Sequence, residues 1–142
     1  MALIPSLKDI ADLTPVDGGQ EYDLRIIKAQ KTKSNRTGRN GVLIVIDITD
    51  EDLALNIMHT LWYGNDGDYT ADDDEKSDMM WRGVKSFLRS LGLDPDNDIE
   101  AEDLEDISFT AIVEYNDGIE VDDDGNETQE YAPKNELGKI TG

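Results

Sequence analysis

The sequence predicts an all-β domain with one main helix, in which five strands build the core and the helix lies between the third and the fourth strand. Segments rich in β-branched and aromatic residues recur along the chain, and they cover residues 22–30, 42–48, 57–63, 108–115 and 131–140. Residues 77–91 alone show a long helical period. With 142 residues and 37% hydrophobic composition, the chain can bury one core. We therefore expect a lead-in of residues 1–19 and a single domain of residues 20–142.

The lead-in is expected to contain a short helix over residues 5–13. Leu7, Ile10 and Leu13 recur at helical spacing, and Pro5 stands just inside the predicted start. Residues 15–20 include two consecutive glycines and predict a turn into the first strand.

The first strand should alternate, with Tyr22, Leu24 and Ile26 on one face. Ile27 breaks this alternation, which predicts a bulge or a change of face near it. Residues 42–48 are apolar on both faces until Asp47, as in a central strand of a small barrel that is covered on both sides. An 11-residue loop, residues 31–41, is expected between the two strands.

The third strand is expected at 57–63, and the main helix at 77–91 with Ser77 as its N-cap. The helix has an apolar stripe at 3–4 spacing, made of Met80, Trp81, Val84, Phe87, Leu88 and Leu91. Gly92-Leu93 predicts a Schellman-type end, with Pro95 following at the usual distance.

The last third of the chain alternates acidic segments with strands. Residues 94–106 contain eight acids, and a fourth strand is expected at 108–115. Residues 116–130 predict a long acidic loop. The last strand, 131–140, contains Pro133, which favours an edge position.

Charge is distributed very unevenly. The chain has 13 Lys and Arg against 33 Asp and Glu, a net charge of −20, yet no acid lies between Arg25 and Ile46. Six cations fall in this stretch, namely Arg25, Lys28, Lys31, Lys33, Arg36 and Arg39. The overall charge opposes binding to nucleic acid at long range. At physiological salt the Debye length is about 8 Å, so a phosphate docked on these cations would respond mainly to nearby charges.

Catalytic and metal motifs are missing from the sequence. There is no cysteine, His59 is the single histidine, and no P-loop or nucleophile triad is present. Residues 94–105 place acids at the ligand positions of a calcium loop, but Ile99 stands where the sharp turn needs glycine. A second acidic run, starting at Glu120, has Tyr131 where the bidentate glutamate belongs. We expect a protein that is not an enzyme and has no cofactor or metal.

No apolar stretch approaches the roughly 18 residues that a membrane helix needs. We therefore expect no membrane partner and a location in the cytoplasm, which is that of the host cell if a phage encodes the chain.

The predicted order of strand, long loop, strand, strand, helix, strand, loop, strand is that of the OB-fold, a five-stranded barrel. The amino-acid sequence also resembles that of a family of small phage OB-fold proteins, which is grouped with phage single-stranded-DNA-binding proteins. Four elements carry this resemblance: the opening strand 19–29, the Ser34…Gly38…Gly41 loop leading into 43–48, the helix end 87–93, and the closing segment 133–140.

The resemblance implies binding of single-stranded DNA during phage replication or recombination, with phage or host replication and recombination proteins as further partners. The sequence departs from such proteins in two ways. It closes Lys139-Ile-Thr-Gly142 where many carry an acidic tail, and the loop before its last strand is acidic.

Single-strand binding combines a positive track for phosphates with aromatic faces for bases. The expected phosphate contacts are Lys31, Lys33, Arg36 and Arg39, with Arg25 and Lys28 behind them, and the expected stacking residues are Tyr22, Trp62, Tyr63 and Tyr69. Arg82, Lys85 and Arg89 form a secondary basic stripe on the helix. The alternative for the loop is a solvated set of charges that offsets the acidic body. For the aromatic residues it is a place in the core, and for the stripe it is pairing within the helix.

A different class of function also fits the composition. The chain could be an acidic interaction module or a DNA mimic that binds a basic partner, such as a nuclease or a recombinase. Within the single-strand-binding hypothesis, we expect the acidic residues 117–130 to lie over the basic loop when DNA is absent.

Overall fold

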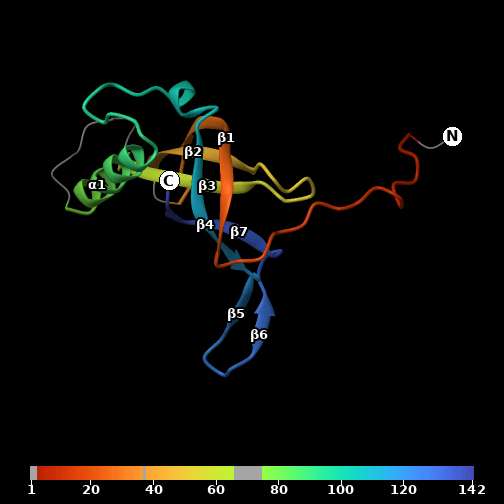
Figure 1. The fold of residues 1–142 in the computed structure, drawn as a ribbon. Coiled ribbons are helices and arrows are strands. Elements are labelled where there is room, and N and C mark those ends of the chain that lie inside the picture. The colour runs from red at the N-terminus through yellow and green to blue at the C-terminus, as the bar shows by residue number, and fades with distance from the viewer. Residues whose placement is uncertain (1–2, 37, 66–74) are drawn as a thin grey trace.

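A five-stranded antiparallel sheet forms the centre of the fold in the computed structural model, which describes residues 3–36, 38–65 and 75–142 (Figure 1). The strand order is β3-β2-β1-β4-β7. These strands are β1 (Gln20–Lys33), β2 (Arg39–Ile48), β3 (Ile57–Asn65), β4 (Ser108–Asn116) and β7 (Lys134–Ile140). Helix α1 (Glu75–Ser90) follows β3 and packs against it, and a 3₁₀ helix, η1 (Ala101–Leu104), precedes β4. The mostly-β class with one main helix is thus confirmed.

The sheet is strongly curved but not closed by hydrogen bonds. Its two edges are β3 and β7, and no backbone ladder joins them within the described residues. Strand β7 nevertheless lies close to β3. The structure therefore has an open five-stranded sheet where the sequence predicts a barrel.

The core lies on the inner face of this sheet, the face that α1 and the residues around η1 cover. Ile26, Ile44, Ile46 and Ile57 are each 0% exposed. Alternation along each strand places these residues on one side and leaves their neighbours on the other. Phe87 and Leu88 of α1 close the core from the helix side.

The predicted bulge in the first strand is confirmed. The pairing of β1 with β2 shifts between Ile26 and Lys28, which leaves Ile27 as the extra residue. Leu24 and Ile26 point inward before the bulge, and Ala29 points inward after it. As a result, Arg25 and Lys28 both lie on the outer face although they are three residues apart.

The connection between the first two strands is much shorter than predicted. Strand β1 runs to Lys33 and β2 begins at Arg39, so only residues 34–38 connect them. Lys31 pairs with Val42, and Lys33 pairs with Asn40. The expected loop of residues 31–41 is wrong because backbone pairing continues through both of its flanks. Gly38 closes the turn with φ 73°, and its N–H donates to the Ser34 carbonyl at 2.9 Å.

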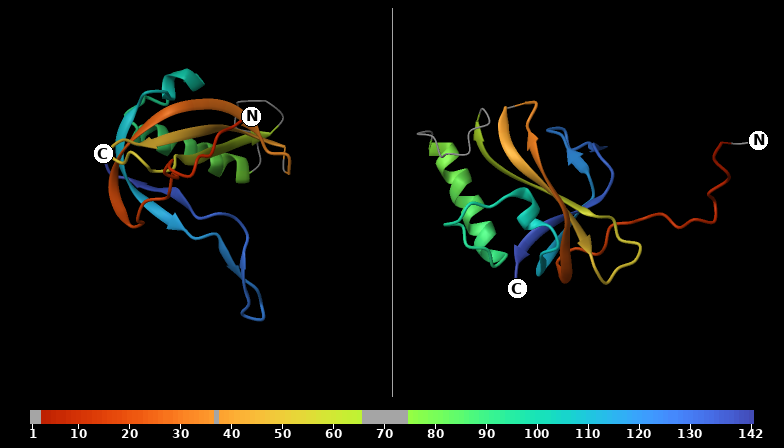
Figure 2. Two further views of the ribbon diagram at one scale, coloured as in Figure 1. Left: turned by 90° about the vertical axis from the view of Figure 1, so that its right-hand side faces the viewer. Right: turned by 90° about the horizontal axis from the view of Figure 1, so that it is seen from above.

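The predicted helix over residues 5–13 is absent. Residues 3–13, called the arm below, extend away from the body (Figures 1 and 2). Their one local backbone bond joins the Ile10 N–H to the Leu7 carbonyl at 3.0 Å. A helix this short is marginal in water unless it packs on something, and no described element of the chain packs on the arm. The chain becomes anchored at Thr14, whose N–H donates to the Leu53 carbonyl at 2.9 Å.

Helix α1 begins at Glu75, so Ser77 lies within the helix and the prediction that it is the N-cap is wrong. Its C-terminal end confirms the predicted Schellman motif. The N–H of Leu93 donates to the Leu88 carbonyl and that of Gly92 to the Arg89 carbonyl, both at 3.0 Å. Gly92 has φ 84°, as this motif requires.

The acidic segment before the last strand contains a β-hairpin that the sequence did not predict. Strands β5 (Ile119–Val121) and β6 (Glu127–Gln129) pair only with each other, and they project from the body (Figure 1). The last strand begins at Lys134, directly after Pro133, and forms an edge as predicted.

Candidate nucleic-acid interface

The outer faces of β1, β2 and β3 together form a surface that no element of the described chain covers with a strand or helix. Cross-strand pairing arranges its residues in three rows. The rows are Lys28–Val45–Met58, Gln30–Leu43–Thr60 and Thr32–Gly41–Trp62. We call these nine residues the outer face. Its two large exposed apolar side chains are Met58, 63% exposed, and Trp62, 36% exposed.

Trp62 lies against the backbone of the neighbouring strand. A Cβ atom on Gly41 would come within 2.7 Å of Cε3 and 3.1 Å of Cζ3 of the indole. The absence of a side chain at Gly41 is therefore what lets the ring lie at this place. An exposed indole supported in this way can offer a ring surface to a nucleobase.

This part of the sheet contains no carboxylate. The row of Ile26, Ile46 and Ile57 marks one limit of this part, and the other limit is the end of the sheet at residues 33, 39 and 65. Between these limits, β1, β2 and β3 contain no Asp or Glu. The next row in the other direction pairs Arg25 with Asp47. In a chain with a net charge of −20, this is a locally positive and apolar region.

The structure divides the predicted phosphate contacts among three places. Lys28 lies in the first row of the outer face and is exposed. Arg36 is exposed in the 34–38 connection, and Lys33 is exposed at the end of β1, where it pairs with the buried Asn40 and belongs to the same face of the strand as Lys31. Arg25 forms an ion pair with Asp106, with 3.7 Å between Nη1 and Oδ1. Both side chains are well exposed, so this pair adds little stability.

Lys31 faces the opposite side of the sheet from Lys28. It lines an open cavity of about 600 Å³ that lies between the inner face of β1, β2 and β3, helix α1 and residues 95–104. Lys85 of α1 lines the same cavity. Arg82 and Arg89 are exposed on α1. Of the predicted helix stripe, Lys85 therefore shares the cavity with Lys31, and this cavity lies across the sheet from Trp62.

Three of the predicted contacts have structural roles in this fold. Arg39 is half-buried, and its Nη1 donates to the Tyr63 carbonyl at 3.3 Å. Tyr63 is 4% exposed and packs on Trp81 with 4.6 Å between ring centroids, so its ring does not reach the surface. The Tyr22 hydroxyl donates to the Asp17 carbonyl at 3.0 Å. Tyr69 lies outside the described residues.

His59 lies on the inner face of the sheet, because it pairs with Ile44, which is buried on that face. Its ring stacks on Phe87 with 5.4 Å between centroids. Burial lowers the pKa of His59 from its ordinary value, because the charged form loses its solvation. This histidine is part of the packing between β3 and α1.

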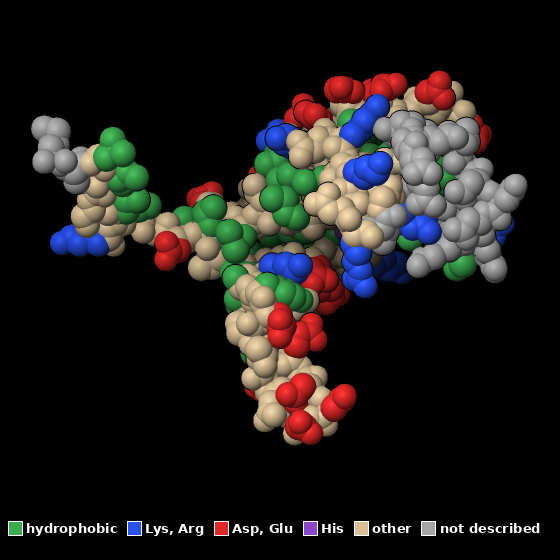
Figure 3. Space-filling model, turned by 180° about the vertical axis from the view of Figure 1, so that it is seen from behind, with side chains coloured by type: hydrophobic (Ala, Val, Ile, Leu, Met, Phe, Trp, Pro, Cys, Tyr) green, Lys and Arg blue, Asp and Glu red, His purple; other side chains and the backbone are tan. Residues whose placement is uncertain are grey.

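The β5–β6 hairpin projects from the body (Figure 2) and carries acidic side chains at its tip (Figure 3). Asp122 Oδ1 accepts the N–H groups of Asp124 at 3.0 Å and Asn126 at 2.8 Å. Hydrogen bonds to its carboxylate hold the pKa of Asp122 below its ordinary value. The largest contribution comes from Asn126, and smaller ones come from Asp124 and Gly125. The expectation that residues 117–130 cover the basic residues is therefore wrong, because their hydrogen bonds build a separate hairpin instead.

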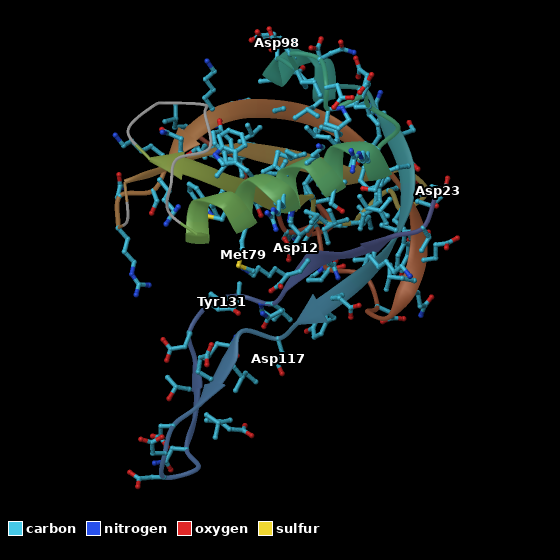
Figure 4. All side chains as sticks on the ribbon, turned by 90° about the vertical axis from the view of Figure 1, so that its left-hand side faces the viewer. Asp12, Asp23, Met79, Asp98, Asp117 and Tyr131 are labelled. Atoms are coloured by element: carbon cyan, nitrogen blue, oxygen red, sulfur yellow. The ribbon has the colours of Figure 1, made fainter. Side chains whose placement is uncertain are left out.

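The base of this hairpin is also well organised. Asp117 and Tyr131 lie where it joins the main sheet (Figure 4). Asn116 Nδ2 donates to the Tyr131 hydroxyl at 2.7 Å, and the Glu130 N–H donates to the Gly118 carbonyl at 2.8 Å. In the part of the chain that the structure describes, no group of three or more acidic or histidine side chains is placed to hold a metal ion.

Sequence reasoning missed Met58 and Gly41 as parts of this surface. The signal was the alternation within 57–63, which puts Ile57, Leu61 and Tyr63 on the same face. Applying that alternation would have placed Met58 and Trp62 outward together, and it would have placed Tyr63 inside.

Neither a protein-family model nor a curated protein sequence matches this chain. Among the described residues, no helix combines the length and the apolar character that crossing a bilayer requires.

Proposed function

We propose that the chain is a binding protein for single-stranded DNA, without sequence specificity, and that it holds the strand across the outer face of β1, β2 and β3. Bases stack on Trp62 and lie against Met58. Phosphates are bound by Lys28, Lys33 and Arg36. The proposal includes a role in phage DNA replication or recombination, in line with the family that the sequence resembles.

The observation that carries this proposal is the combination of an exposed indole, an exposed methionine and the exposed Lys28 on a part of the sheet without carboxylates. Lys33 at the end of β1 and Arg36 in the 34–38 connection lie beyond the last row of this face. Single-strand binding needs both ring surfaces and a positive track. The strand order supports it as well, because the order β3-β2-β1-β4-β7, with helix α1 between the third and fourth of these strands in the chain, is that of the OB-fold. We propose that β3 and β7, which lie close together, are the two sides of a partly open OB barrel.

The test is fluorescence anisotropy with a labelled single-stranded oligonucleotide, its duplex and an RNA of the same sequence. The variant Lys28→Glu/Lys33→Glu/Arg36→Glu should lose most of its affinity for the single strand. A matched control, Arg82→Glu/Arg89→Glu/Lys139→Glu, changes the net charge equally and lies away from the outer face. Equal losses in the two variants would show a general charge effect and would reject the proposed surface.

The β5–β6 hairpin favours the second candidate function, an acidic module that binds a basic protein. Seven carboxylates belong to the hairpin and its base, namely Asp117, Glu120, Asp122, Asp123, Asp124, Glu127 and Glu130. They stand on a projecting and internally hydrogen-bonded hairpin (Figure 3). Replacing residues 118–130 by a short Gly-Ser linker distinguishes binding of a basic protein from binding of single-stranded DNA. It removes the acidic surface, whereas it leaves the outer face and its affinity for single-stranded DNA intact.

A further inference from the structure

We propose that the arm of one molecule, residues 3–13, folds into an amphipathic helix that docks in the open cavity between α1 and residues 95–104 of a second copy. This inference concerns self-assembly. It does not depend on the proposed binding of DNA.

The arm exposes more apolar surface than a lone molecule in water would keep uncovered. Its large apolar residues are all more than half exposed, from 53% to 97%, and they are Leu3, Ile4, Leu7, Ile10 and Leu13. The space-filling view shows apolar side chains along the arm, well apart from the body (Figure 3). Nothing in the described part of the same chain covers them.

The pattern of these residues is that of a helix, although the lone chain does not form one. At 100° per residue, Leu7, Ile10 and Leu13 occupy one side of a helical wheel, and Leu3 and Ile4 lie just before the helix because Pro5 starts it. Lys8 then flanks one edge of this apolar side and Asp9 flanks the other. A segment with this pattern and no packing partner is unfolded alone and becomes helical when a groove covers its apolar side.

The cavity offers such a groove. Its volume of about 600 Å³ is in the range of ligand and peptide sites. Apolar side chains line its floor and walls, among them Val42, Leu61, Val84, Leu88 and Ile99. Three side chains of the arm, Leu7, Ile10 and Leu13, present the matching surface.

The charges at the rim complement those of the arm. Lys85 lines the cavity from α1, whereas Asp98 and Glu100 line it from the facing segment. Asp98 stands at the top of that segment, above α1 (Figure 4). A docked arm helix would therefore place Asp9 beside Lys85 and Lys8 beside the two acids.

The arm must reach a second molecule to make this contact. The arm and α1 lie at opposite ends of the body (Figures 1 and 2). A helix over residues 5–13 is only about 14 Å long, and it begins on the side of the body away from α1, so the arm faces a neighbouring molecule and not its own cavity (Figures 1 and 2). Arm and cavity are different surfaces, so two molecules either exchange arms in a closed dimer or join head to tail in a ring or an open chain.

The test is sedimentation velocity of the full chain over a wide range of concentration. We expect self-association that grows with concentration and strengthens between about 0.05 M and about 0.5 M salt, because salt screens the repulsion between two acidic molecules. The variant Leu7→Asp/Ile10→Asp should associate at least about 100-fold more weakly. Its thermal midpoint should not change, because the arm has no contact with the core.

A charge swap tests the site itself. Lys85→Glu alone should weaken association, and adding Asp9→Lys should restore it. As a second measurement, a labelled peptide of residues 3–14 should bind the Leu7→Asp/Ile10→Asp chain, whose cavity is free, and should bind its Lys85→Glu derivative less well. A monomeric wild type at every concentration, or association that survives Leu7→Asp/Ile10→Asp, overturns the proposal. Association that depends on the arm but is unchanged by Lys85→Glu and by Asp9→Lys also overturns the proposal, because the arm then binds to another surface.

Discussion

Replacing Trp62 by alanine removes the one exposed ring on the outer face and should weaken binding of single-stranded DNA. One surface of the indole lies on Gly41, and the side chain is 36% exposed, so it can stack with one base at a time. Stacking of a base on an aromatic side chain contributes about 1–3 kcal/mol, which corresponds to roughly 5- to 150-fold in the dissociation constant. The fold should be retained, because the side chain is not part of the core.

Tryptophan fluorescence provides the assay. The chain has two tryptophans, so Trp81→Phe leaves Trp62 as the only one while keeping a ring against Tyr63. Titration with a single-stranded oligonucleotide should quench the remaining emission, and the Trp62→Ala chain should show the weaker affinity by anisotropy. A change in affinity of less than about twofold, or no quenching of Trp62 at saturation, would refute the stacking role.

Four other perturbations test the packing on which this surface depends. Gly41→Ala brings a Cβ within 2.7 Å of the Leu61 carbonyl oxygen and of the Trp62 ring. The substitution should lower the free energy of unfolding by about 1–3 kcal/mol and shift the emission of Trp62. Unchanged emission would contradict the placement of the ring. Ile44→Ala, at a residue that is 0% exposed, should cost about 2–5 kcal/mol in urea denaturation, and a negligible cost would contradict the core. Because burial lowers the pKa of His59, the unfolded chain takes up a proton below about pH 6.5 that the folded chain does not. Wild-type stability should therefore fall more steeply than that of His59→Gln as the pH drops below this value, whereas parallel curves would argue against a buried neutral histidine. Excision of residues 118–130 should leave the thermal midpoint nearly unchanged, since β5 and β6 pair only with each other, and a large drop would show that the hairpin supports the sheet.

The regular elements of this fold could be predicted from local patterns. Alternation located the strands, Ile27 marked the bulge in β1, and Gly92 marked the end of α1. These features depend on neighbours in sequence, which is why the sequence alone was enough. Pro133 likewise indicated an edge strand because it cannot donate to a ladder.

The errors concern features that depend on tertiary pairing. Lys31 and Arg39 were expected in a loop because their segment is polar, but ladder hydrogen bonds extend both strands through them. The arm was expected to be helical from its spacing, yet helix formation over so few residues needs a surface to pack on. The β5–β6 hairpin was missed because acidic strands of three residues have no apolar alternation to reveal them.

The candidate site was predicted in composition but not in arrangement. Clustering of cations along the chain indicated a basic loop, whereas the bulge at Ile27 and strand alternation send Lys28 and Lys31 to opposite faces. Tyr63 was grouped with Trp62 because they are adjacent, although adjacent residues of a strand face opposite sides. Only the cross-strand rows bring Trp62 and Met58 together with Lys28.

The salt dependence of binding tests the central claim most directly. If Lys28, Lys33 and Arg36 each neutralise one phosphate of single-stranded DNA, a log–log plot of affinity against salt should have a slope of about −2. The slope of Lys28→Glu/Lys33→Glu/Arg36→Glu should be near zero, and the control with three reversals elsewhere should keep the wild-type slope. An unchanged slope in the triple variant, or no binding of single-stranded DNA by the wild type at low salt, would contradict the assignment of this surface.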